Sequence, residues 1–219
     1  MSPYARGARE GLGSIEPMNS FKTIAWVTTA IFALITLVAK GPATYRFAIL
    51  FLAPMLWAVY FLRNRLHIHS CHFAIFATAL VLHNLGAFGS YGQQYYGLDF
   101  DTYVHFYFGV AGGFIVARAL RGCFGLVGWQ LWVGTVIVIL GLGAIHELVE
   151  YASTLMLGPE KGMLKLNSPD AKTDTQKDLL NNMLGTLVAL LIYSVYRGLR
   201  SSRVQEASRD SKREAAKTA

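Results

Sequence analysis

The chain has 219 residues, of which 53% are hydrophobic and 15% are charged, and its formal net charge is +7 at neutral pH. Long apolar runs alternate with short polar connections, a pattern that excludes an ordinary soluble domain. The basic excess does not indicate nucleic-acid binding, because Lys and Arg gather just beyond the ends of the apolar runs, where such residues orient membrane helices.

Six apolar segments predict an all-α protein, a polytopic membrane protein built as a bundle of about six transmembrane helices. A helix rises about 1.5 Å per residue, so roughly 20 apolar residues cross a hydrocarbon layer about 30 Å thick. The runs are too long and too uniformly apolar for the alternating pattern of an outer-membrane barrel. In chain order the predicted spans cover residues 21–38, 46–62, 67–86, 101–120, 126–155 and 178–196.

These spans divide the chain into three parts. Residues 1–20 form an N-terminal segment, residues 21–196 the transmembrane domain, and residues 197–219 a basic tail. We interpret the first span as an uncleaved helix, because it is long and no small-x-small cleavage signal follows it before Lys40. The polar tail is predicted to extend the sixth helix and then to become disordered.

The distribution of basic residues predicts the orientation. The loop at residues 90–100 has no Lys or Arg, whereas basic residues precede the first span and follow the second, fourth and sixth spans. This positive-inside pattern predicts a multi-pass protein of a bacterial inner (plasma) membrane with both termini in the cytoplasm. Membrane lipids are the expected partners. The basic residues are Arg6, Arg9, Lys22, Arg63, Arg65, Arg118, Arg121, Arg197, Arg200 and Arg203.

In this orientation, polar residues of four different spans lie at the outer side of the membrane. One carboxylate in mid-membrane costs about 2.5–3.5 kcal/mol, and two carboxylates 4 Å apart repel by about 4 kcal/mol at an effective dielectric constant of 20. Such a cluster must therefore hold protons, pair with cations or bind a metal ion. Its members are His83, Asp101, His105, His146, Glu147, Glu150, Asp174, Asp178 and Asn182.

The spacing within each span places these residues on one helix face. Residues three or four positions apart share a face, and Asp101 and His105 are four apart. Two longer polar stripes include small residues, which let helices approach closely in lipid, so we expect the stripes to face one another. They are Gly143, Glu147, Glu150 and Thr154 in the fifth span, and Asp178, Asn182, Gly185 and Ala189 in the sixth.

The mixture of carboxylates and imidazoles predicts a divalent metal site. Carboxylate and imidazole ligands together suit Zn, Mn or Fe, whereas carboxylates with water suit Mg or Ca. A hydrogen-bonded structural network and an ion pathway are the alternatives. We interpret Glu150 as a catalytic general base, and His83, His146 and Asn182 as substrate-binding or supporting residues. The predicted metal ligands are Asp101, His105, Glu147, Asp174 and Asp178.

Four short motifs follow one another through the second half of the chain. They are HNLGA at 83–87, DTYVHF at 101–106, ELVE at 147–150 and DTQKD at 174–178. This pattern resembles the YjdF-like family of bacterial inner-membrane proteins, whose function is unknown. The resemblance covers about half the chain, from His83 to Leu190. Two positions depart from it: Tyr151 stands where tryptophan is usual, and His146 stands where the family tends to have tyrosine.

The sixth span also carries Asp178, Asn182 and Gly185 in the spacing Asp-x-x-x-Asn-x-x-Gly. Together with the Asp-x-x-x-His helix and a Glu-containing helix, this layout is similar to VanZ-like proteins linked to glycopeptide-antibiotic tolerance. That weaker resemblance implies a role in the cell envelope without defining a reaction.

Two functions follow from the sequence. The first is a metal-dependent envelope or lipid-modifying hydrolase, acting on a lipid-linked or other periplasmic small-molecule substrate from an outward-facing carboxylate/histidine site. The second is a non-catalytic membrane protein that binds or transports a lipid, an envelope precursor or a cation. The sequence shows no nucleophile motif, phosphate loop or redox-cofactor signature, which favours binding slightly over catalysis and leaves the question of an enzyme open.

Overall fold

The computed structural model describes residues 18–41, 46–158, 162–163 and 172–218. Residues 1–17 of the predicted N-terminal segment, with Arg6 and Arg9 among them, lie outside the described residues. The described chain is almost entirely helical, with one short hairpin. Its elements are α1 (Met18–Val38), α3 (Ile49–Leu62), α4 (Ser70–Asn84), the 3-10 turns η2 (Leu85–Phe88) and η3 (Ser90–Gly92), the antiparallel strands β1 (Gln94–Tyr95) and β2 (Leu98–Asp99), α5 (Phe100–Phe124), α6 (Gly128–Leu157) and α7 (Asp174–Thr218).

Five of the described helical segments are long and apolar enough to cross a membrane, and α3 is a sixth, shorter apolar helix. The prediction of an all-α polytopic membrane bundle is therefore confirmed. The second span differs from expectation, because α3 has 14 residues and rises only about 21 Å. The five long segments are Ser20–Val38, Ser70–Phe88, Phe100–Phe124, Gly128–Leu157 and Asp174–Arg203.

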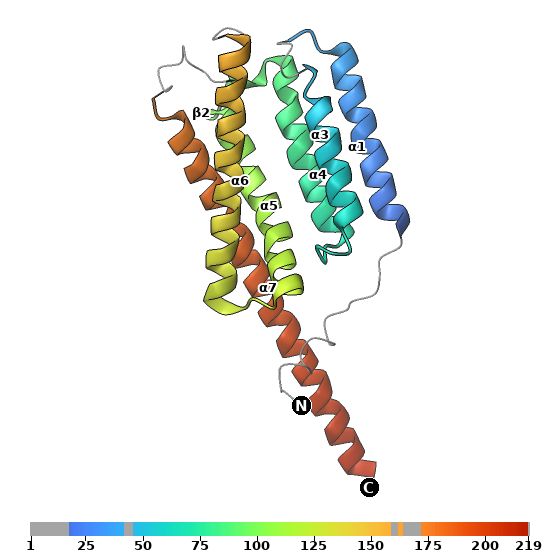
Figure 1. The fold of residues 1–219 in the computed structure, drawn as a ribbon. Helices are drawn as coiled ribbons and strands as arrows, with labels where there is room; N and C mark the ends of the chain where they lie inside the picture. The colour runs from blue at the N-terminus through green and yellow to red at the C-terminus, as the bar shows by residue number, and fades with distance from the viewer. Residues whose placement is uncertain (1–17, 42–45, 159–161, 164–171, 219) are drawn as a thin grey trace.

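The helices pack as two groups of three that lie side by side (Figure 1). In the first group, α1, α3 and α4 enclose the fully buried side chains of Phe32, Leu56 and Phe73. In the second group, α5, α6 and α7 enclose Leu131 and Leu190. Helix α4 packs against α5 and joins the two groups.

Large apolar side chains also cover the outer surface of the bundle. Leu37 on α1 is 80% exposed and Met156 on α6 is 84% exposed, and α3, α5 and α7 carry similar exposed residues. A soluble monomer rarely exposes apolar surface on this scale. Lipid is the environment in which this surface is stable.

Glycines bring α5 and α7 into close contact. A Cβ atom at Gly109 would overlap the backbone oxygen of Asn182, and one at Gly185 would overlap the backbone oxygen of Phe106. On α6, a Cβ atom at Gly143 would lie 2.7 Å from Nδ2 of Asn182. Gly143 and Asn182, one residue from each of the two predicted stripes, are therefore in contact, whereas Gly185 of the α7 stripe packs against α5.

Four helix ends meet at one end of the bundle, where α4 and α6 end and α5 and α7 begin (upper end in Figure 1). The start of α1 and the far end of α7 lie at the opposite end. The helical extension predicted after Tyr196 belongs to α7, which projects past the other helices and continues to Thr218. Disorder of this tail stays a prediction.

Candidate functional site

The hairpin before α5 places the first polar residues of the site. Strand β2 leads directly into α5, and Nε2 of Gln94 donates a hydrogen bond to Oδ1 of Asp99 at 3.0 Å. The hydroxyl of Tyr103 in α5 donates to the backbone oxygen of Tyr95 at 2.7 Å, which ties the hairpin to the helix. Asp101 therefore stands in the first turn of α5, at the end of the bundle where α7 also begins.

Two helices bring three buried ionisable side chains together, which we name the Asp/His group: Asp101 and His105 on α5 and Asp178 on α7. Nε2 of His105 lies 3.4 Å from Oδ1 of Asp101 and 3.7 Å from Oδ2 of Asp178. One potential ligand atom from each residue lies within 4.8 Å of the other two. All three residues are less than one tenth exposed, so they form a compact group shielded from the bulk surroundings.

A second polar cluster adjoins this group through neighbouring histidine rings, one pair edge-on and the other tilted. The ring of His146 on α6 lies 5.8 Å from that of His105 and 5.6 Å from that of His83, measured between centroids. Nε2 of His146 lies 3.2 Å from Oε1 of Glu150, one turn further along α6. At the outer end of the cluster, Nδ1 of His83 is 2.7 Å from the hydroxyl of Tyr91.

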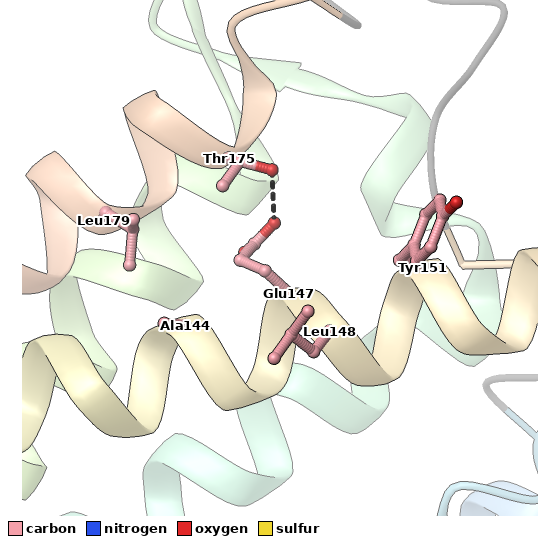
Figure 2. Close-up of a pocket in the computed structure, with 6 residues that line it drawn as sticks. All are labelled: Ala144, Glu147, Leu148, Tyr151, Thr175 and Leu179. Atoms are coloured by element: carbon pink, nitrogen blue, oxygen red, sulfur yellow. Dashed lines mark hydrogen bonds between the residues drawn. The ribbon is translucent and has the colours of Figure 1, made fainter.

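Glu147 points elsewhere, toward the first turn of α7 (Figure 2). Its Oε2 accepts a hydrogen bond of 2.9 Å from the hydroxyl of Thr175. The side chain forms part of the wall of a pocket of about 410 Å³ between α6 and α7. Ala144, Glu147, Leu148, Tyr151, Thr175 and Leu179 line this pocket.

Two buried amides lie close to these clusters in sequence. Asn182 follows Asp178 by one turn of α7, and Asn84 is next to His83 on α4. Both are at most 1% exposed, and neither amide nitrogen nor amide oxygen has a hydrogen-bond partner in the described part of the chain. Buried polar groups are normally hydrogen-bonded. Water or a ligand is therefore the expected partner of these amides.

The structure brings three of the five predicted metal ligands together, namely Asp101, His105 and Asp178. Glu147 is not a member of this group and instead bonds to Thr175. Asp174, the first residue of α7, is half-buried and also lies outside the group. Whether these two carboxylates bind metal stays a prediction.

The remaining predicted residues border the Asp/His group. Glu150, the predicted general base, pairs with His146, whose ring lies between those of His105 and His83. Asn182 lies deeper along α7. The helical period predicted that these residues face inward. Which side chain each of them contacts depends on how the helices are rotated relative to one another.

Two hydroxyl groups lie in the site that were not among the predicted site residues. Thr175 lies inside the DTQKD motif, and that position was the available signal. Tyr91 lies in the connection between α4 and α5, and its contact with His83 spans eight residues of irregular chain. The periodicity of a helix or a strand therefore does not predict that His83 and Tyr91 are in contact.

The fold and the site together define a polytopic helical membrane protein with a buried Asp/His group near one end of its bundle. The family described as "Predicted membrane protein (DUF2238)" matches residues 21–198, which is about four fifths of the chain. The chain belongs to this family. No curated protein and no solved structure matches it. The resemblance to YjdF-like and VanZ-like proteins stays a prediction.

Proposed function

We propose that the Asp/His group binds one divalent metal ion, and that the protein is a metal-dependent hydrolase acting on a lipid-linked or other envelope substrate. The supporting observation is the position of a single imidazole nitrogen, Nε2 of His105, opposite two buried carboxylate oxygens. Both the distances between these atoms and the net charge of the Asp/His group support a bound metal ion.

The distances suit a shared ion better than direct pairing. Charge-assisted N–H···O bonds are about 2.7–2.9 Å long, whereas the two separations from Nε2 of His105 are 3.4 and 3.7 Å. Tetrahedral ligands with bonds of about 2.0–2.2 Å to zinc lie roughly 3.3–3.6 Å from one another. A small adjustment of the side chains would therefore complete a three-ligand metal site.

The charge of the group supports the same conclusion. With ionised Asp101 and Asp178 the group carries two negative charges, and protonation of His105 removes only one of them. A divalent ion with a neutral imidazole brings the sum to zero. Because buried net charge is costly in a membrane, the neutral combination is favoured. The mixed oxygen and nitrogen ligands suit Zn, Mn or Fe.

The neighbouring residues receive roles from their positions. A bound divalent ion supplies Lewis acidity and activates a water molecule for attack. Glu150, oriented by His146, is the proposed general base. Asp174, one turn before Asp178, is proposed as a further ligand. Glu147 faces the pocket rather than the Asp/His group, so we assign it to the substrate side.

The location is proposed to be a bacterial inner membrane with the site at the outer face. The connection after α3 contacts the end of α5, where Arg118 donates through Nε to the backbone oxygen of His67 and Cys123 donates to that of Arg65 at 2.9 Å. Basic residues therefore gather at the end of the bundle that lies away from the Asp/His group. The positive-inside rule makes this end cytoplasmic.

The test is elemental analysis of the purified full chain, followed by reloading with zinc or manganese. We expect about one equivalent of metal in wild type and loss of most of it in Asp178→Asn, which removes one ligand charge at nearly constant shape. Asp99→Asn is the matched control, because it makes the same change on the hairpin next to the site and should keep the metal. Wild type that neither carries nor rebinds metal would refute the proposal and favour the non-catalytic binding or transport function.

A further inference from the structure

The pocket between α6 and α7 has an apolar wall and one polar end. Ala144, Leu148 and Leu179 supply apolar surface, while Glu147 and Thr175 meet at the polar end (Figure 2). Its volume of about 410 Å³ lies in the range of small-molecule sites, about 300–1,000 Å³. A long apolar chain with one polar group is the shape of ligand that such a pocket accepts.

The described residues leave one oxygen of the Glu147 carboxyl group without a partner. The residue is 7% exposed, and its Oε1 is buried without a hydrogen-bond partner among the described residues. Its Oε2 accepts a hydrogen bond from a neutral hydroxyl, that of Thr175. A buried carboxyl oxygen without a hydrogen-bond partner is unfavourable. Oε1 therefore points to a ligand with a hydrogen-bond donor, and an ammonium group is a donor that would also balance the charge of an ionised carboxylate.

The surface around the pocket is apolar and faces lipid. Leu148 and Tyr151, which line the pocket, are 65% and 53% exposed, and Leu155 beyond them is also exposed. The polar end lies at the first turn of α7, close to the end of a predicted span. This is the depth of lipid headgroups. A molecule already in the bilayer reaches the pocket without crossing water.

The polar end of the pocket is also close to the Asp/His group. Thr175 and Asp178 are three residues apart on α7 and share a helix face, within one turn of about 5.4 Å. An ethanolamine phospholipid carries its ammonium and its phosphate on a two-carbon bridge, which is a comparable span.

We propose that this pocket binds a membrane lipid with a primary ammonium headgroup, entering sideways from the bilayer. The ammonium donates to Oε1 of Glu147, and an acyl chain lies against Leu148 and Leu179. The inference deepens the proposed function by naming its substrate class, and it rests on that function only for the step from binding to reaction.

The test is titration of the delipidated full chain with single lipids, followed by native mass spectrometry. The probes are dioleoyl phosphatidylethanolamine, phosphatidylcholine, which has no N–H donor, and phosphatidylglycerol, which is anionic. We expect the ethanolamine lipid to bind about tenfold more tightly than the other two, a ratio that corresponds to about 1.4 kcal/mol. Equal binding of the three lipids, or preference for the glycerol lipid, would overturn the assignment.

Three variants locate the binding. Ala144→Trp fills the pocket, and Ile145→Trp places the same bulk on the next residue, which is 58% exposed and does not line the pocket. We expect the first variant to lose the lipid preference and the second to keep it. Glu147→Gln nearly keeps the shape of the side chain, and it should also lose the preference. Unchanged preference in Glu147→Gln or Ala144→Trp would refute the proposed site.

Metal analysis of the same preparations separates the two proposals. Ala144→Trp should keep its metal while it loses the lipid preference, because the pocket wall lies outside the Asp/His group. A wild type without metal that still prefers the ethanolamine lipid would refute only the metal site. A metal-loaded wild type without lipid preference would refute only the pocket.

Discussion

Removal of the metal should destabilise the protein by an amount set by the spacing of the Asp/His group. Oxygens of Asp101 and Asp178 lie within 4.8 Å of each other. At an effective dielectric constant of 20, two negative charges at that separation repel by about 3.5 kcal/mol. A free-energy change of this size corresponds to a fall in Tm of roughly 7–14 °C for a chain of 150–250 residues. Because His105 can take up a proton and offset part of the repulsion, we expect a fall near the lower end of this range.

The assay is thermal unfolding of the detergent-solubilised protein, with and without a chelator at neutral pH. Re-adding zinc or manganese should restore the Tm by mass action. The double variant Asp101→Asn with Asp178→Asn carries no such repulsion, so chelator should shift its Tm by less than about 2 °C. Asp99→Asn should respond as wild type does. A wild type that is indifferent to chelator and carries no metal would show that the group is a protonated or hydrogen-bonded structural network.

Two further predictions concern topology and packing. With the native cysteines replaced, Gln93→Cys should react with an impermeant thiol reagent on intact cells, whereas Ser201→Cys should react only after permeabilisation. Labelling of Ser201→Cys from outside would reverse the orientation and the placement of the site. Gly185→Ala should destabilise the bundle by about 1–3 kcal/mol in thermal or denaturant unfolding, because the added Cβ overlaps the backbone oxygen of Phe106. Gly141→Ala is the matched control, since nothing lies within 4 Å of its Cβ position, and it should be neutral or stabilising by up to about 1 kcal/mol. Equal effects of the two substitutions would contradict the close α5–α7 contact.

The sequence by itself determined the class of protein and the gathering of its polar residues at one end of the helices. The thickness of the bilayer sets the length of an apolar span, so five long spans were predictable within a few residues. The helical period also predicted which side chains share a face, and Asp101, His105, Glu147, Asp178 and Asn182 are all buried as expected. The second span ends at Leu62 as predicted, but α3 begins at Ile49 rather than at residue 46 and is shorter than the other membrane helices.

Only the tertiary structure decided which of these inward-facing residues meet. Glu147 and Asp178 lie on stripes with the same rhythm, yet Asp178 joins His105 while Glu147 turns to Thr175 and the pocket. The helical period is a property of one helix and carries no information about its neighbours. The partners depend on the rotation and depth of each helix, which are set where Gly109, Gly143 and Gly185 let backbones and side chains approach closely. Those contacts join residues more than 30 positions apart, so the pattern within one helix does not reveal them. They fix the helix rotations that direct Asp178 to the Asp/His group and Glu147 to the pocket beside it.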